Sequence, residues 1–207
     1  MDYNYLISAI TGYLFGCFQA SYFVGLLVNK IDIREHGSTN AGASNVTMVM
    51  GFKWGVVVAV LDILKGSAAV WLSQFLFPGQ IEFAFIAGIC AIMGHIYPFF
   101  MKFQGGKGIA TLIGMFLALN WQLGLIILGI QVIVSLVTDY VAVGSLLLYV
   151  TLPALVYYFE FSQLCILLSL LMLIIGIYKH IPNARRIKNG EEPKIRATLA
   201  KKRNKAD

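Results

Sequence analysis

The chain has 207 residues, of which 58% are hydrophobic and only 13% are charged, and its formal net charge is +6. Because soluble domains carry about 25% charged residues, this composition excludes an ordinary soluble protein and predicts one polytopic membrane domain, residues 1–207. No basic stripe alternates with aromatic residues on a soluble module, so a nucleic-acid partner is not expected.

Long apolar segments make up most of the chain. In chain order they cover residues 4–28, 54–77, 81–101, 109–138, 140–159 and 162–179. The polar breaks between them lie at 29–53, 78–80, 102–108, around 139, at 160–161 and from 180 onward. Since about 20 apolar residues span the hydrocarbon core, these segments predict membrane-crossing helices.

The distribution of positive charge predicts the topology. Lys and Arg gather in the loop 29–53, in the turn 102–107 and in the tail, which holds ten of the sixteen between Lys179 and Lys205. The positive-inside rule places these three regions in the cytoplasm and the N-terminus outside. Residues 194–207 are therefore expected to form a basic cytoplasmic tail that can meet anionic lipid.

This topology requires a break within the run 109–138. A single helix there would leave the basic tail outside, whereas a break at Asn120-Trp121-Gln122 gives helices at about 109–119 and 123–138. The expected fold is an all-α integral membrane protein of seven transmembrane helices, two of them short. Its N-terminus lies outside and its C-terminus inside.

The first cytoplasmic break, DIREHGSTNAGASNV, sets polar side chains among glycine and alanine. Glycine lets backbone N–H groups turn toward a ligand, and small side chains let the ligand come close. We take Ser38 as a candidate catalytic group. The candidate binding groups for substrate or phosphate are Arg34, Gly37, Asn40, Gly42 and Asn45. The alternative is a flexible loop without a ligand.

The second break, KFQGGKGIA, places Lys107 among Gly105, Gly106 and Gly108 immediately before a predicted helix. A glycine-rich turn at a helix N-terminus offers free N–H groups and a favourable dipole, and the lysine adds a charge. The turn therefore predicts an anion site with Lys107 as a catalytic candidate. The alternative is an interfacial turn whose lysine reaches toward water.

The third break, HIPNARRIKNGEEPKI, offers His180 and Asn183 as catalytic candidates and Arg186 and Glu192 as binding candidates. A continuing helix would put His180 and Asn183 on one face. Pro182, however, disfavours helix at the residue before it. The alternative is a basic stop signal at the end of a membrane helix.

Three ionisable residues lie within apolar segments and are expected to be structural or to support the site. Asp62 and Lys65 are three apart, as in a helical ion pair, and His95 lies near the end of its segment. The three cysteines are isolated and are expected to pack. No His, Cys or carboxylate spacing predicts a metal site, and no cofactor is expected.

Together the three polar clusters resemble the PlsY family of bacterial membrane acyltransferases. GHIYPFFMKFQGGKGIAT follows the family pattern G-H-x-[FY]-P-x-[FY]-x-x-F-x-G-G-K-G-x-A-T almost throughout. The first cluster departs from the approximate pattern G-S-G-N-x-G-A-T-N-V-x-R, because Thr39 replaces a glycine, Ser44 a threonine and Met48 an arginine. Ile181 also replaces an arginine that is usual beside the histidine.

The resemblance implies acyl transfer from acyl phosphate to glycerol 3-phosphate, giving lysophosphatidic acid and phosphate in phospholipid biosynthesis. It also implies a multi-pass protein of the bacterial cell membrane, in contact with lipids, whose active site faces the cytoplasm. Met48 leaves open a divergent relative that uses another acceptor or is inactive. A transporter of small anions or lipids is a further alternative, although only one interrupted helix is visible.

Overall fold

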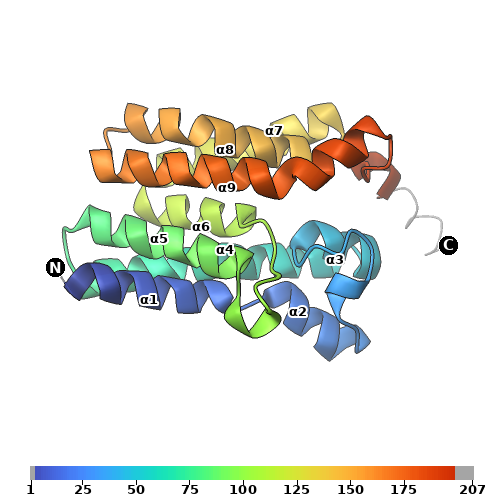
Figure 1. The fold of residues 1–207 in the computed structure, drawn as a ribbon, viewed down its shortest axis with the longest axis horizontal. Helices are drawn as coiled ribbons and strands as arrows, with labels where there is room; N and C mark the ends of the chain where they lie inside the picture. The colour runs from blue at the N-terminus through green and yellow to red at the C-terminus, as the bar shows by residue number, and fades with distance from the viewer. Residues whose placement is uncertain (1–2, 199–207) are drawn as a thin grey trace. The chain divides into compact units, whose positions relative to one another are not determined.

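The computed structural model describes residues 3–198, which form helices and connecting loops with no strand among them (Figure 1). The α-helices are α1 Tyr3–Cys17, α2 Ala20–Val24, α3 Ala43–Met50, α4 Phe52–Leu76, α5 Ile81–Ile96, α6 Ile109–Leu119, α7 Trp121–Thr138, α8 Val141–Tyr158 and α9 Gln163–Lys188. Three short elements lie between them: the π-helical turn η1 Gly25–Asn29 and the 3-10 helices η2 Ile33–Glu35 and η3 Phe99–Met101.

Six stretches of the described chain are long and apolar enough to cross a membrane. They are Tyr3–Asn29, Phe52–Leu76, Ile81–Met101, Trp121–Thr138, Val141–Tyr158 and Gln163–Lys188, and α6 is a shorter apolar helix of 11 residues. The predicted break within 109–138 is confirmed at Asn120, whose side-chain oxygen accepts a hydrogen bond from Leu123 N at 3.0 Å. The second helix of the run begins slightly earlier than expected, at Trp121.

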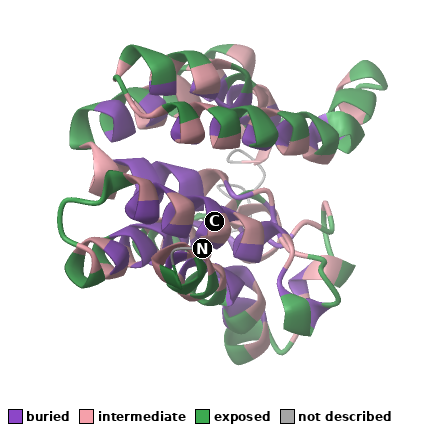
Figure 2. Cartoon of the chain, turned by 60° about the vertical axis from the view of Figure 1, so that its left-hand side comes forward, coloured by how far each residue is buried: buried purple, intermediate pink, exposed green. Residues whose placement is uncertain are grey.

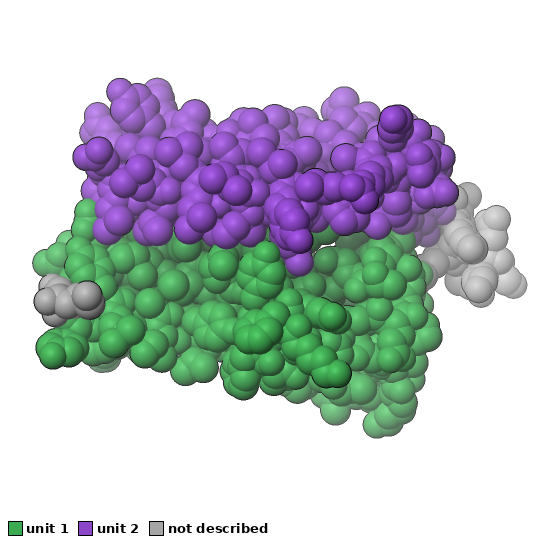
Figure 3. All heavy atoms as spheres, in the orientation of Figure 1, with its two compact units in different colours: residues 1–124 green, residues 125–207 purple. Residues whose placement is uncertain are grey.

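The chain divides into two compact units, residues 1–124 and 125–207 (Figure 3). In unit 1, α1 packs against α5, and α4 packs against α3, α5 and α6. In unit 2, α8 packs against α9. Figure 2 colours the buried residues purple.

Glycine permits close approach between the helices of unit 1. A Cβ atom at Gly12 or Gly16 of α1 would overlap the backbone of α5 at Ala87 or Ala91. A Cβ atom at Gly114 of α6 would likewise overlap the backbone of α4 at Ile63. Because the hydrophobic effect does not drive helices together in lipid, close packing at small residues stabilises their association. These contacts also bring the polar ends of the helices together.

The first apolar run is not one continuous helix. It breaks at Phe18 and Gln19, and it ends in η1, after which Lys30 adopts φ 57°. Gln19 is fully buried, and its amide donates to the backbone oxygens of Gly16, Gly94 and His95 at 3.0–3.4 Å. The apolar segment expected over 4–28 is therefore one candidate span, Tyr3–Asn29, but its helix is broken where Gln19 bonds to the end of α5.

The last apolar helix also differs from expectation. It runs through Pro182 to Lys188, so Pro182 does not end the helix at the residue before it, and the polar residues from 180 to 188 are helical. Proline lacks the N–H group that would bond to the carbonyl group four residues earlier. Near a membrane surface, water or a polar side chain can bond to that carbonyl group instead, so the helix can continue. His180 and Asn183 consequently lie on one helical face, and both are buried.

The start of the basic tail binds within unit 2. Asp139, at φ 64°, accepts from Ile195 N through its backbone oxygen at 3.0 Å and from Arg196 N through its carboxylate at 2.9 Å. The segment from 195 to 198 is helical. The remainder of the predicted tail, residues 199–207, lies outside the described residues.

Candidate active site

Asn45, at the start of α3, shapes the loop that precedes it. Its Oδ1 accepts from Ser38 N at 2.8 Å, and its Nδ2 donates to the carbonyl groups of Ile33 and His36, both at 2.9 Å. Gly37, at φ 60°, lies so close that a Cβ atom there would overlap Asn45 Oδ1. Both amide hydrogens of Asn45 are thus engaged within the loop, which makes it a positioning residue.

The loop carries strain at the position where the family pattern has glycine. Thr39 adopts φ 61°, a left-handed conformation that is unusual for a β-branched residue. Its hydroxyl donates to the Ser38 oxygen at 2.7 Å. The backbone therefore keeps a glycine-like turn beside Ser38 and Asn40, both of which are half-buried.

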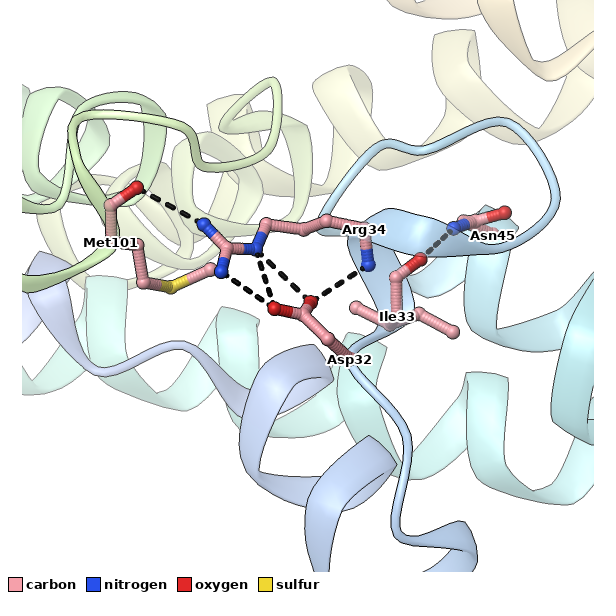
Figure 4. A network of polar contacts seen from close by, with 5 residues as sticks. All are labelled: Asp32, Ile33, Arg34, Asn45 and Met101. Atoms are coloured by element: carbon pink, nitrogen blue, oxygen red, sulfur yellow. Dashed lines mark hydrogen bonds and ion pairs between the residues drawn. The ribbon is translucent and has the colours of Figure 1, made fainter.

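Arg34 ties this loop to the second one (Figure 4). Its guanidinium pairs with Asp32 at 2.6 Å and donates to the Met101 oxygen in η3 at 3.1 Å. The guanidinium also lies 5.5 Å from the centre of the Tyr22 ring. The hydrogen bond from Arg34 lowers the pKa of Asp32 below its ordinary value, and Asp32 in turn raises the pKa of Arg34.

We expect Asp32→Asn to remove a pH-dependent part of the stability. A carboxyl group whose folded pKa is lowered stabilises the fold at neutral pH, and the gain is lost as pH falls from its ordinary 3.8 through the lower folded value. The pair is partly exposed, so the loss at neutral pH should not exceed about 1 kcal/mol. Thermal unfolding in detergent at several pH values measures it.

The exposed neighbour Glu35 supplies the control for this experiment. Glu35→Gln removes a charge from the same loop without removing the carboxylate that binds Arg34, so its unfolding midpoint should follow the wild type at every pH. A stability gap between wild type and Asp32→Asn that persists unchanged in acid would contradict the assignment.

The glycine-rich turn is fixed to the end of α5 by its own backbone. Gly105 N donates to Ile96 O and Gly106 N donates to His95 O, each at 3.1 Å. These two amides close the end of α5 and are not available to an anion, which revises the role expected for them. A substrate could instead meet Lys107 and the first N–H groups of α6.

The geometry at the start of α6 fits that role. Gly108 is its N-cap at φ 80°, and the Gly108 oxygen accepts from Leu112 N at 2.8 Å. The N–H groups of residues 109–111 therefore have no carbonyl group within the helix to bond. Lys107 is half-buried beside them, so positive charge and helix dipole act in the same place.

Asp62, Lys65 and His95 form one buried cluster beneath the turn. Lys65 Nζ lies 2.8 Å from Asp62 Oδ1 and 2.7 Å from His95 Nδ1. The ion pair expected between Asp62 and Lys65 is present, and His95 joins it. Two residues that the sequence analysis did not select also contact this cluster. Gln19 donates to the His95 backbone oxygen, and the Phe18 oxygen accepts from Lys65. The one sequence feature that could have indicated them is a glutamine within an apolar segment.

The candidates of unit 2 lie on α9 and just after its end. His180 Nδ1 lies 2.7 Å from the Gly176 oxygen, and because a carbonyl group can only accept, Nδ1 carries the proton and Nε2 the lone pair. Asn183 Nδ2 donates to Glu192 Oε1, and Arg186 Nε donates to Glu192 Oε2, both at 2.7 Å. Glu192 thus orients two candidates, and its negative charge would repel a phosphate.

Each group of candidates therefore gathers within its own unit. In unit 1, Arg34 connects the loop of Ser38, Asn40 and Gly42 to the turn of Lys107, while unit 2 holds the cluster on α9. Among residues 3–198 no group of three or more His, Cys, Asp or Glu side chains could hold a metal ion.

Comparisons with known proteins assign the chain to a family. The profile described as glycerol-3-phosphate acyltransferase matches residues 6–190. Glycerol-3-phosphate acyltransferase 1 of Oceanobacillus iheyensis is 40% identical over 206 residues, covering 96% of this chain and 98% of the relative. The glycerol-3-phosphate acyltransferase of Thermoanaerobacter pseudethanolicus is 42% identical over 190 residues, covering 92% and 95%.

Solved structures agree with the sequence comparisons. The crystal structure of PlsY (YgiH), an integral membrane glycerol 3-phosphate acyltransferase, in its glycerol 3-phosphate form has a TM-score of 0.84 and 28% identity, covering 92% of this chain and 95% of that one. Its lysophosphatidic acid form has a TM-score of 0.81. The chain belongs to the glycerol-3-phosphate acyltransferase family.

Proposed function

We propose that this membrane protein transfers an acyl group from acyl phosphate to the 1-hydroxyl of glycerol 3-phosphate, forming lysophosphatidic acid and phosphate for phospholipid synthesis. Family membership and the two similar PlsY structures support this reaction. The observation that carries it is the Gly105–Gly108 turn, which leads Lys107 into the N-terminus of α6. Both substrates bear a phosphate that such a site suits.

The reaction needs no covalent enzyme intermediate. The acceptor oxygen attacks the acyl carbonyl carbon, the bond from that carbon to the phosphate oxygen breaks, and phosphate leaves with the electron pair. The hydroxyl proton passes to His180 Nε2 or to the departing phosphate. Acyl phosphate is already an activated mixed anhydride, so positioning, worth about 7–11 kcal/mol, can supply much of the acceleration.

Individual residues take the following roles in the proposal. Lys107 and the first amides of α6 bind a phosphate, and Ser38 with Asn40 stabilises the developing oxyanion. Asn183 orients the acceptor beside His180, and Arg186 adds positive charge. Asn45, Gly37 and Glu192 position these groups, a role that the contacts of Asn45 and Gly37 within the loop and of Glu192 with Asn183 support.

The proposal extends to topology and location. Six spanning helices together with the short α6 make seven crossings, with the N-terminus outside, the C-terminus inside and the site facing the cytoplasm. α6 rises about 16 Å against about 30 Å of hydrocarbon, so neighbouring helices must shield its ends. The protein would lie in the cell membrane, and its acyl substrate would enter from the lipid.

The test is acyl transfer by the purified protein from palmitoyl phosphate to glycerol 3-phosphate, with Met48→Arg measured alongside. Met48 lies half-buried on α3, where methionine cannot bind an anion. We expect turnover by the wild type and a lower KM for glycerol 3-phosphate in Met48→Arg, by about tenfold if one charged contact is gained.

Two other results would redirect the proposal. Turnover only in Met48→Arg would mean that the wild type uses another acceptor. No turnover in either protein, with both folded and membrane-inserted, would rule out the acyltransferase activity. Lys107→Met is the complementary variant, because it removes the charge that is proposed to bind the phosphate.

A further inference from the structure

A buried charged cluster lies where both loops of unit 1 meet the membrane helices. Asp62, Lys65 and His95 are only 2%, 5% and 3% exposed. Lys65 Nζ contacts three groups: Asp62 Oδ1 at 2.8 Å, the Phe18 oxygen at 2.7 Å and His95 Nδ1 at 2.7 Å. Two of these contacts are hydrogen bonds, and the one with Asp62 is an ion pair.

The contacts of Lys65 determine where the protons lie. The Phe18 carbonyl can only accept, so Lys65 donates one hydrogen to it, and the Asp62 carboxylate pairs with the ammonium charge. If Lys65 were neutral, it would accept from His95 Nδ1, and Asp62 would be balanced only if the His95 ring carried two protons beside it, 3.5 Å from Asp62 Oδ1. An amine is far more basic than an imidazole, so the proton that balances Asp62 stays on Lys65. A charged Lys65 that donates to Nδ1 leaves the cluster neutral, which burial strongly favours. The His95 ring then carries its proton on Nε2.

The opposite edge of the His95 ring borders both loops. A Cβ atom at Gly106 would overlap His95 Nε2 and would lie 2.6 Å from the Ala41 oxygen of the first loop. The backbone oxygen of His95 accepts from Gly106 N at 3.1 Å and from Gln19 Nε2 at 3.0 Å. His95 is therefore the residue on which the first loop, the glycine-rich turn and the break between α1 and α2 converge.

We propose that Lys65 is a positioning residue, which fixes the tautomer and orientation of His95 and thereby holds the glycine-rich turn and Lys107 in place for the phosphate group. The inference rests on the proposed function only for the identity of that phosphate. Asp62 keeps the ammonium charged in the membrane, and Lys65 also fixes the helix break at Phe18.

Nitrogen NMR of the whole protein in detergent, labelled only in histidine, tests the tautomer directly. The chain has three histidines, His36, His95 and His180, so each ring can be assigned by substitution. We expect His95 to carry its proton on Nε2 and His180 to carry its proton on Nδ1. His180 therefore provides a reference signal for the other tautomer in the same spectrum. A proton on His95 Nδ1 in the wild type would overturn the proposal without reference to any activity.

The functional part is tested with the double variant Asp62→Asn/Lys65→Met. Removing both partners of a buried ion pair avoids leaving one charge alone, so this variant should fold where single variants fail. We expect the His95 tautomer to shift, and KM for glycerol 3-phosphate to rise roughly tenfold to 100-fold with a smaller change in kcat. Leu64→Met, on the lipid-exposed side of α4, is the matched control.

The outcomes separate this proposal from the proposed function. An unchanged KM and an unchanged His95 signal in a folded double variant would overturn the positioning role. If the wild type lacks acyl transfer altogether, binding of glycerol 3-phosphate replaces KM as the readout. The tautomer of His95 is decided in either case.

Discussion

Gly106→Ala should lose at least about 100-fold in acyl transfer, because the turn has no room for one more carbon. The new Cβ would overlap His95 Nε2 and would approach the backbone oxygen of Ala41 to 2.6 Å. The ring is held by Lys65 and cannot swing away, so the turn itself must shift. That shift would move Lys107 and the start of α6 away from the substrate phosphate.

The matched control is Gly129→Ala on α7, where a Cβ would meet nothing within 4 Å. Alanine is the better helix former by about 1 kcal/mol, so this variant should retain activity and should not be less stable. Steady-state kinetics and the unfolding temperature of both variants check the pair. Near wild-type kinetics in a folded Gly106→Ala protein would show that the position of the turn does not matter.

His180→Gln should lower kcat by about 10²–10⁴ if Nε2 accepts the proton of the attacking hydroxyl. The hydrogen bond from Nδ1 to the Gly176 oxygen leaves the lone pair on Nε2, and glutamine offers no basic nitrogen in its place. The ring is also buried 6.0 Å from the centre of Tyr149, which restricts its orientation. Single-turnover kinetics would isolate the chemical step from product release.

His36→Gln controls for the loss of an imidazole, since His36 is exposed on the first loop and its side chain should not affect turnover. A fall of less than about tenfold for His180→Gln would rule out the role of a base. In that case the departing phosphate would be left as the proton acceptor, and His180 would serve in binding.

Some features of the site could be predicted from the sequence because they depend on local order. Glycines beside Lys107 at a helix start, and Asp62 three residues from Lys65, both follow from helical geometry. The break at Asn120 followed from charge balance across the membrane. The individual roles of the glycines and of Asn45 could not be predicted from the sequence. They depend on which distant carbonyl or amide group each of these residues hydrogen-bonds to or packs against.

The sequence by itself determined the class of the protein, its apolar helices, and the three polar clusters that carry the family pattern. Only the tertiary structure decided which backbone amides are already bonded, that α9 continues through Pro182, and that His95 lies against Gly106. The physical reason is that membrane helices and topology depend on the hydrophobicity and charge of consecutive residues, which can be added up from the sequence alone. Hydrogen bonds such as Gly106 N to His95 O depend instead on helices that pack together only in the folded protein.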